Sequence, residues 1–568
     1  MKKILATKYW WIVLLTGLVL INIAASFIHL RADLTAEKRY TLSAPTRKML
    51  ANLDEQVSIT VFLDGDMPAS FKKLRNSTQD LLSELKDYGK ANIRFKFEKA
   101  GQGLSDSSKA YFLDSIARLG VKPYTINAQV KEGEGEEQRQ VVPGALIACN
   151  GRATAVDLLS GQSSGLDEGS INRVEATLEY KFASAIQKVT TDSVQVIGYL
   201  LGNGEIFSDR IKDLIDNNIR KKYGFAFFHI DSFPAIPKVF NALIINKPIK
   251  KFTDDQKLKI DQYVMNGGKV MWMIDNLYAE MDSLQRVQNE FIAFDRALNL
   301  EDLLFKYGVR INLDLVQDLN CDKNPSVVGT AGGKPQIQLL PWPYFPLVSS
   351  NNNNPISKNL DYVLTQFPNS IDTMVKAAGI KKTVLLTTSD ASRILSSPAK
   401  VAWNSIQNAE DIKTFTKSYI PVAVLLEGKF SSLYTNRVTA SIKDALDAAH
   451  ATFKAHNESD NKMIVISDGD IATNFVTQNE GALAMGMNPY TKYKYANGEF
   501  VMNSLEYLVD NSGILETRGK DFTLRLLDKK KLETEKTTWQ LIAIVFPLLL
   551  VLLFGILYQV LRKRKYQR

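Results

Sequence analysis

The sequence predicts an α/β protein in which a multi-domain soluble region, built around a mostly parallel sheet, lies between two terminal transmembrane helices. Two long stretches, residues 9–30 and 539–560, are apolar and contain no acid, Lys or Arg. At about 1.5 Å per residue, each is long enough to cross a hydrocarbon core of about 30 Å. From Ser193 onward, short apolar β-branched runs alternate with helical patterns, which indicates a parallel sheet.

The basic charge of the chain is concentrated at its ends. The formal net charge is +9, and three lysines in residues 1–30 together with five basic residues in 561–568 supply eight of these charges. The near-neutral region between the ends argues against a nucleic-acid partner. Basic tails beside apolar helices favour an anionic membrane face, so we expect contact with membrane lipid, both termini in the cytoplasm and the large region outside.

The first apolar stretch also has an alternative interpretation as a cleaved signal peptide. The apolar core of a signal peptide is usually about 7–15 residues long, and this stretch is longer. Ala24-Ala25-Ser26 is in addition a poor cleavage site. We therefore expect an uncleaved anchor.

These patterns divide the chain into consecutive parts. The expected parts are a cytoplasmic tail at 1–8, a transmembrane helix at 9–30, an N-terminal α/β domain at 31–190, a second α/β domain at 191–526 with a strand-rich insertion near 320–400, a charged tether at 527–538, a transmembrane helix at 539–560 and a basic cytoplasmic tail at 561–568.

Within the first domain, period-2 alternation predicts strands at 57–64 and 93–100, with a helix at 79–90 between them. The highly charged segment 131–140 is interpreted as a hairpin tip between two strands. Apolar residues recur three and four positions apart from Ile171 to Val189, which predicts an amphipathic helix with Ser170 as its N-cap.

The second domain reads as strands and helices in alternation. Strands are expected at 194–200, 225–230, 241–248, 269–275, 383–389, 421–428 and 461–470, and helices around 208–221, 254–266 and 440–455. Four consecutive asparagines at 351–354 and several prolines mark loops in the insertion.

A glycine-rich turn, Gly202-Asn203-Gly204-Glu205, follows the first of these strands. Doubly wound folds bind anions at this position, using the amides of a helix N-terminus. The turn lacks the G-x-G-x-x-G spacing, and Glu205 would repel a phosphate. We therefore interpret it as a structural turn that remains a possible functional one.

Two carboxylates, Asp468 and Asp470, end the last predicted strand and are weak candidates for a Mg²⁺ or Ca²⁺ site. The competing interpretation is a tight turn that caps the next helix. Asn246-Lys247-Pro248 follows a strand where related sheets carry a nucleophile, but neither Ser nor Cys is present. The chain shows no ATPase motif, no catalytic constellation of its four histidines and no cofactor motif, so we expect neither an enzyme nor a cofactor.

Cys149 and Cys321 are the only cysteines. Two cysteines are too few for a disulfide framework, and we expect buried free thiols, with a single bridge as the alternative.

Several segments together resemble the gliding-motility-associated ABC transporter auxiliary (GldG) family. They include the opening motif with Asp33, Leu34, Thr35, Tyr40, Leu42 and Ser43, the segment 171–186, the turn at Gly202, the segment ending at Asn474 and residues 497–508. The likeness covers nearly the whole chain. It departs at Asn203, where the family often has His.

The resemblance implies a non-enzymatic auxiliary subunit of a transporter complex involved in gliding motility, located in the cytoplasmic (inner) membrane with its large domain in the periplasm. It also implies a multispanning permease as partner and, through it, a cytoplasmic ATPase. The central sheet is expected to be similar to glutamine-amidotransferase-like domains that lack a nucleophile. The alternative functions are a membrane-anchored periplasmic receptor for a glycan or peptide, and a degenerate hydrolase or metalloenzyme using Asp468, Asp470 and Glu205.

Overall fold

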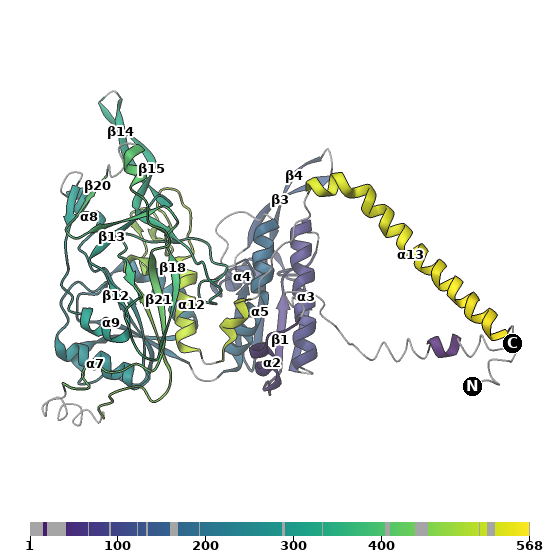
Figure 1. Cartoon of the computed structure of the whole chain (residues 1–568), viewed down its shortest axis with the longest axis horizontal. Helices are drawn as coiled ribbons and strands as arrows, with labels where there is room; N and C mark the ends of the chain where they lie inside the picture. The colour runs from purple at the N-terminus through teal and green to yellow at the C-terminus, as the bar shows by residue number, and fades with distance from the viewer. Residues whose placement is uncertain are drawn as a thin grey trace. The chain divides into compact units, whose positions relative to one another are not determined.

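The structure is a computed structural model of the whole chain (Figure 1). It describes residues 15–19, 41–65, 67–89, 92–121, 123–131, 134–159, 168–191, 194–286, 290–331, 333–403, 409–437, 452–510, 512–519 and 529–566. The chain divides into two compact units, Met1–Lys520 and Asp521–Arg568.

A four-stranded sheet forms the N-terminal part of the first unit, in the order β2–β1–β5–β6. Its strands are β1 (Val57–Val61), β2 (Ile93–Phe97), β5 (Gly144–Cys149) and β6 (Arg152–Asp157). β1 runs parallel to β2 and antiparallel to β5. The helices α2 (Ala44–Ala51), α3 (Ala69–Gly89) and α5 (Glu168–Thr190) share one apolar core with this sheet.

The amphipathic helix predicted after residue 170 is α5. Val174, Leu178, Phe182, Ile186 and Val189 are buried, as their spacing predicts. The helix already includes Glu168, so the prediction that Ser170 is the N-cap was wrong; Ser170 lies inside the helix. Likewise, the helix predicted at 79–90 is the second half of α3, which begins at Ala69.

The charged segment 131–140 was predicted as a hairpin tip, and a hairpin does close between Lys131 and Glu134, but the rest of the segment is strand. Residues Glu134–Val141 form strand β4, which pairs antiparallel with β3 (Tyr124–Lys131). Charged residues are common on edge strands, where they oppose pairing with another chain. Helix α4 (Asp106–Arg118) precedes this hairpin.

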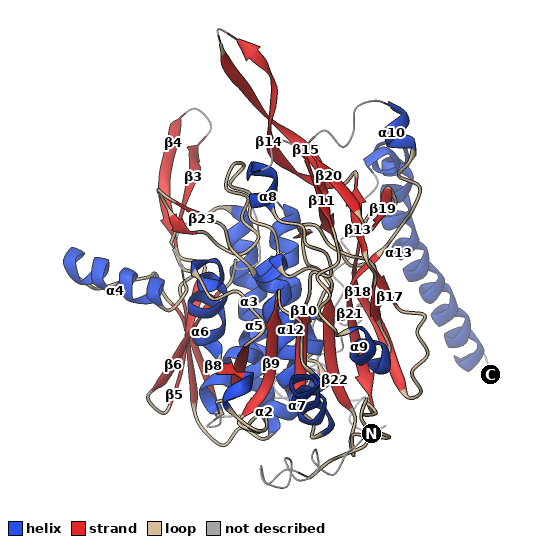
Figure 2. Cartoon of the chain, turned by 90° about the vertical axis from the view of Figure 1, so that its left-hand side faces the viewer, coloured by secondary structure: helices blue, strands red, loops and turns tan. Residues whose placement is uncertain are grey.

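The second α/β part is built on a seven-stranded sheet with the order β18–β21–β22–β10–β9–β7–β8 (Figure 2). The strands are β7 (Val196–Leu201), β8 (Gly224–His229), β9 (Phe240–Asn246), β10 (Lys269–Met273), β18 (Ile380–Thr387), β21 (Pro421–Gly428) and β22 (Asn461–Ile466). Five adjacent strands from β22 to β8 are parallel, whereas β21 is antiparallel to both of its neighbours. The sheet is therefore mixed, with a parallel majority.

Both faces of this sheet are covered. Met271 and Met273 of β10 pack in one core with the helix α12 (Asn497–Val509). Val270 and Trp272 of the same strand pack in a second core with the helices α7 (Asp254–Met265) and α9 (Glu301–Tyr307). Successive residues of a strand point to opposite faces, so these buried runs place helices on both sides, as in doubly wound folds.

The segment predicted as one helix at 208–221 is irregular. It contains a 3₁₀ turn (Asp209–Ile211), a π-helix η3 (Asp213–Ile219) and a single turn α6 (Arg220–Lys222). The side-chain amide of Asn218 donates to the carbonyl oxygen of Asp213 at 2.7 Å. In a regular α-helix this carbonyl oxygen would accept a backbone hydrogen bond, and here the side chain of Asn218 also donates to it. The spacing of apolar residues in the sequence does not reveal such a bond.

The predicted insertion is rich in strands. A long hairpin pairs β14 (Cys321–Ala331) with β15 (Lys334–Val348), and it projects at the top of Figure 1. Four prolines that were interpreted as loop markers lie inside β15: Pro335, Pro341, Pro343 and Pro346. Along most of its length β15 pairs on one edge only, with β14, and proline is tolerated where the backbone position faces the unpaired edge and needs no ladder donor.

The remaining strands of this part form short pairs. They are β11 (Glu290–Ala293) with β20 (Ala399–Ala402), β12 (Arg310–Ile311) with β17 (Ile371–Asp372), β13 (Asp314–Asp318) with β19 (Ser392–Ser396), and β23 (Val476–Thr477) with β24 (Gly481–Ala482), while β16 (Val363–Leu364) joins β15. The helices α8 (Met281–Arg286) and α10 (Ala409–Lys413) are short, and η4 (Ile230–Ser232), η5 (Asp470–Ala472) and η6 (Ile514–Gly519) are 3₁₀ turns.

Two predictions fall partly or wholly outside the described residues. For the helix predicted around 440–455, only residues 452–455 are described, and they are not helical. For the first transmembrane span, residues 15–19 are described and helical. The domain boundaries at residues 190 and 526 stay predictions.

The second unit contains one helix, α13 (Lys529–Tyr566), in its described part. Glu535–Arg564 has a mean hydropathy of 2.9 over its most apolar window, so this helix is long and apolar enough to cross a membrane. It is the only such helix among the described residues, which means that two terminal spans are not established. The predicted tether at 527–538 is helical from Lys529 onward.

Candidate functional site

The carboxyl ends of the parallel strands bring most of the candidate residues to one edge of the sheet. Gly202–Glu205 follow β7, Lys247 follows β9, Asp275 follows β10 and Ser467–Asp470 follow β22. Parallel strands have their carboxyl ends at the same edge, and doubly wound folds place ligand sites there. This edge is therefore the candidate functional site.

Lys247 is the centre of this site. Its side chain is only 3% exposed, and its ammonium nitrogen lies 3.1 Å from Asp275 Oδ2 and 3.1 Å from Glu280 Oε2. It also contacts Asp470 Oδ2. The backbone of Lys247 has φ = 50°, the left-handed region that non-glycine residues rarely adopt, so the turn after β9 directs this side chain at the cost of some strain.

Two arginines complete the ion-pair network. Arg296 is buried and donates to Glu280 Oε1 at 2.6 Å, and Arg210 donates to Asp470 Oδ1 at 2.9 Å from a partly exposed position. Together with Lys247, the two arginines supply three positive charges, which match the three negative charges of Asp275, Glu280 and Asp470. A buried ion must be paired to be tolerated, and here the signs balance.

The sequence-predicted carboxylates Asp468 and Asp470 are both engaged by protein groups. Asp468 accepts from the backbone amides of Gln366 and Asp470, each at 2.7 Å. Burial and the neighbouring Asp275 and Asp470 carboxylates raise the pKa of Asp468 well above its usual value. Burial opposes ionisation of Asp470 too, but Lys247 and Arg210 outweigh it and lower the pKa of that carboxyl.

In this arrangement the charged groups neutralise one another, which favours a structural role over a catalytic one. Burial alone would lower the pKa of Lys247, but its three carboxylate partners raise it above the usual value, so the amine stays protonated and is a poor nucleophile or base. Among the described residues, no group of three His, Cys, Asp or Glu side chains has an arrangement that could hold a metal ion. A metal role for Asp468 and Asp470 stays a prediction.

The turn Gly202–Glu205 is bound to the segment that follows Lys247. The carbonyl oxygen of Asn203 accepts from the amides of Ile249 and Lys250, at 2.9 and 2.8 Å. Its side-chain amide donates to Gln256 Oε1 at 2.9 Å, which links the turn to α7. Gly204 has φ = 76°, and a Cβ atom there would lie 2.6 Å from Ile249, so the turn requires glycine at this position.

Glu205 lies 6% exposed inside this turn. One carboxylate oxygen accepts from the amide of Asn203 at 2.8 Å, and the other has no hydrogen-bond partner. Burial, with a smaller contribution from Asp231, raises the pKa of Glu205 to about 7. The turn therefore packs closely and leaves no open row of amides for a phosphate.

The opening motif falls mostly outside the described residues, which exclude Asp33, Leu34, Thr35 and Tyr40. Leu42 is buried in the N-terminal core. Ser43 caps helix α2, and its backbone amide donates to Glu179 of α5 at 2.8 Å. These two residues join the start of the folded region to its longest amphipathic helix.

Both cysteines are free. Cys149 is buried, and its thiol donates to Glu55 at 3.1 Å, whereas Cys321 is partly exposed. The prediction of free thiols agrees with this structure, although only one of them is fully buried.

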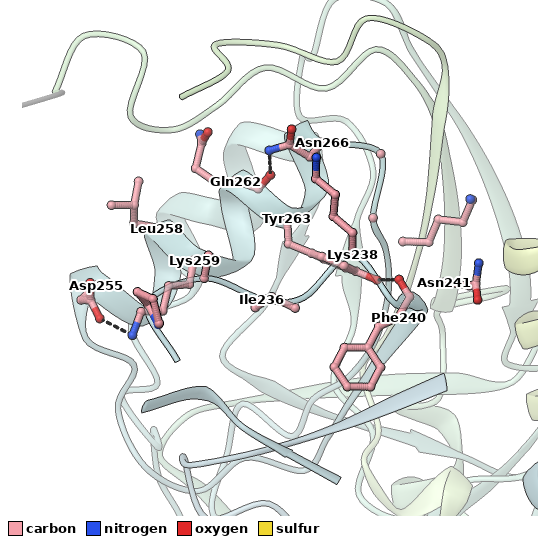
Figure 3. Close-up of a pocket in the computed structure, with 15 residues that line it drawn as sticks. Ile236, Lys238, Phe240, Asn241, Asp255, Leu258, Lys259, Gln262, Tyr263 and Asn266 are labelled. Atoms are coloured by element: carbon pink, nitrogen blue, oxygen red, sulfur yellow. Dashed lines mark hydrogen bonds and ion pairs between the residues drawn. The ribbon is translucent and has the colours of Figure 1, made fainter. Parts of the chain in front are cut away.

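A pocket of about 230 Å³ lies at the opposite, amino edge of the sheet (Figure 3). Its wall includes Tyr263, which donates to the carbonyl oxygen of Phe240 at 3.0 Å, and Lys259, which pairs with Asp255 at 2.8 Å. These polar groups are already paired inside the protein, and this edge is not where doubly wound sheets bind ligands. We assign it no function.

Sequence reasoning missed much of this network. Asp275 was detectable, because it follows a predicted strand of the same sheet and so lies at the same edge. The other members of the network, Glu280, Arg296 and Arg210, lie in loops and an irregular helix. Neither the spacing of apolar residues nor the order of the strands predicts where such segments lie in space.

Fold and site together define an α/β protein with a doubly wound sheet, a closed ion-pair network at the carboxyl edge and an apolar helix in a separate C-terminal unit. The chain belongs to the ABC transporter auxiliary family, described as an ABC-type uncharacterized transport system, whose profile matches residues 195–504. Residues 36–148 match a domain family of unknown function.

An uncharacterized protein of Borreliella burgdorferi is 20% identical over 521 residues, which cover 89% of this chain and 94% of that protein. Among solved structures, the N-terminal domain of mmIFT52 matches with a TM-score of 0.30 and 12% identity, over 58% of this chain and all of that one.

Proposed function

We propose that this protein is a non-enzymatic auxiliary membrane subunit of an ABC transporter complex involved in gliding motility. The match of residues 195–504 to an ABC-type transport family is the observation that carries the proposal. The helix of membrane-spanning length in the described part, even together with a second one predicted at residues 9–30, is too little to enclose a transport pathway. Transport therefore requires a multispanning permease and, through it, a cytoplasmic ATPase.

The proposal includes that the protein has no catalytic activity. The ion pairs around Lys247 at the carboxyl edge of the sheet support this part. Catalytic lysines work with a lowered pKa, whereas the ammonium group of Lys247 is held by three carboxylates. The network ties the segments after β9, β10 and β22 into one rigid surface. Its role would then be to present a fixed shape to a partner.

The location in the inner membrane, with both termini in the cytoplasm and the large region in the periplasm, belongs to the same proposal. It rests on the basic tails and on the apolar helix α13. The second candidate, a periplasmic receptor for a glycan or peptide, remains open because the first unit contains a large polar cavity.

Co-purification of the full chain in a mild detergent tests the proposal. It predicts recovery of a multispanning permease together with an ATPase. Recovery of the chain by itself in several mild detergents would contradict it.

A further inference from the structure

A cavity of about 540 Å³ lies in the first unit, and none of its lining residues belongs to the ion-pair network around Lys247. It is bounded by α5, the π-helix η3, α12 and η6. A volume of this size is typical of a small-molecule site. Because its walls come from both the N-terminal and the second α/β part, a bound molecule would contact both.

One wall is the π-helix. Asp213, Asn217 and Asn218 of this helix line the cavity. The carboxylate of Asp213 is saturated by the side-chain amides of Asn217 and Asn218 and by the backbone amide of Met485. π-Helical segments are rare and occur often at functional sites, since the extra residue per turn redirects side chains.

Arg518 of η6 is the most unusual group in the cavity. It is 8% exposed, and its guanidinium lies 5.2 Å from the ring centroid of Tyr180 and donates to Asn503 Oδ1 through Nη1. Its Nε–H has no hydrogen-bond partner. The carboxylates nearby pair with lysines instead: Glu506 lies 2.8 Å from Lys222, and Glu499 lies 3.5 Å from Lys494. A buried cation without a counterion is costly, and an anion would remove that cost.

Three lysines add to this positive charge: Lys181, Lys221 and Lys494. The acidic residues in the lining are Asp213, which is saturated as above, and Glu499, which lies 3.5 Å from Lys494. The lining contains four basic and two acidic side chains, although Lys181 also donates to the carbonyl oxygen of Leu158 at 2.7 Å and is influenced by Asp157 outside the cavity. Arginine also offers two parallel N–H donors, a geometry that fits the oxygens of a carboxylate or phosphate group.

We propose that this cavity binds a small polar molecule through a carboxylate or phosphate group, with the guanidinium of Arg518 as its main anchor and Lys494 as a second cation. The assignment goes beyond the auxiliary role in transport. It also distinguishes the ligand from a neutral glycan, which would leave the charge of Arg518 uncompensated.

Calorimetric titration of the detergent-solubilised full chain tests the proposal with three probes: inorganic phosphate, citrate and the uncharged disaccharide maltose. We expect phosphate or citrate to bind, and maltose to give no heat. Arg518→Gln should weaken binding of the anion at least tenfold, and Lys494→Gln severalfold. The control Lys413→Gln, at an exposed position outside the cavity, should bind like the parent chain.

The two variants keep the test decisive. If Arg518→Gln fails to fold, as judged by thermal unfolding, Lys494→Gln decides the outcome, because the side chain of Lys494 is 41% exposed. Binding of phosphate alone or of citrate alone would identify the oxyanion. Equal binding of maltose, unchanged anion binding in the variants, or no binding of either anion at millimolar concentration would overturn the proposal.

Discussion

Gly469 lies so close to Lys247 that a Cβ atom on the glycine would be 2.6 Å from the Cβ atom of the lysine. The backbone amide of Gly469 also donates to Asp275 Oδ1 at 2.5 Å. The turn after β22 can therefore reach the ion-pair network only if residue 469 has no side chain.

Gly469→Ala should lower the free energy of unfolding by about 1–3 kcal/mol, because the added methyl group must displace the backbone of one of the two turns. Chemical or thermal unfolding of the solubilised chain measures this. Gly329→Ala is the matched control, since a Cβ atom there would meet only the end of Gln336 at 3.9 Å. Equal stability of the two variants would contradict the close packing.

Lys247→Met should destabilise the protein by about 3–5 kcal/mol, because it leaves Asp275, Glu280 and Asp470 with too little positive charge. The loss should shrink as the pH is lowered, because burial raises the pKa of Glu280 and this carboxyl then takes up a proton. The control is Lys492→Met, which removes an exposed pair with Glu480 and should cost at most about 1 kcal/mol. A loss of stability that does not change with pH would show that it comes from altered side-chain packing and not from the missing positive charge.

Glu205 should give the fold a pH dependence near neutrality. Its pKa of about 7 in the folded chain lies above the ordinary value, so the folded state binds the proton more tightly. Glu205 therefore favours folding at low pH, and this contribution is lost as the pH rises through 7. The full change is on the order of 3 kcal/mol.

Glu205→Gln should remove that slope between about pH 5 and 8 and make the chain more stable than the parent at pH 8. Thermal unfolding across this range is the measurement. Glu480→Gln, at an exposed site, should leave the slope unchanged. A parent chain whose stability does not fall over this range would show that Glu205 is already ionised.

Anion binding in the cavity should strengthen as the pH falls from 9 to 7. Burial, together with the nearby Arg518, lowers the pKa of Lys181 to about 8, although Asp157 and Glu499 oppose this shift. Above pH 8 this lysine is mostly neutral, and below it the cavity gains a positive charge. Calorimetric titrations with citrate in buffers of different ionisation enthalpy should show that the protein takes up protons when citrate binds. Lys181→Met should abolish this proton uptake.

The sequence predicted the sheet more completely than the site. Apolar runs located β7, β9, β10, β21 and β22 because strand burial leaves a direct compositional signal. The single reversed strand, β21, has no such signal, since its residues are apolar in either direction. The irregular helix at 209–222 depends on side-chain bonds from Asn217 and Asn218, which a hydrophobic pattern does not contain.

At the site, the sequence identified loops but not their partners. Gly202–Glu205, Lys247 and Asp468–Asp470 were visible because each follows a predicted strand. That Asp470 pairs with Lys247 and Arg210 follows from strand order in space, which a single sequence does not specify. The charges of Glu280, Arg296 and Arg518 are likewise contributed by loops and a 3₁₀ turn.

Topology can be tested by cysteine labelling in a parent chain with Cys149→Ala and Cys321→Ala. Asn353→Cys lies at an exposed position and should react with a membrane-impermeant maleimide added to intact cells. Gln567→Cys, in the basic tail, should react only after the membrane is opened. The reverse pattern would place the large region in the cytoplasm.

The central claim is membership in a transporter complex, and quantitative co-purification tests it most directly. Affinity capture of the tagged full chain in mild detergent should recover a multispanning permease and an ATPase in fixed ratio. Removal of residues 539–568 should abolish that recovery, whereas the control Lys413→Gln should retain it. Capture of the full chain as a monomer in every detergent, with cellular function unchanged after the deletion, would contradict the account.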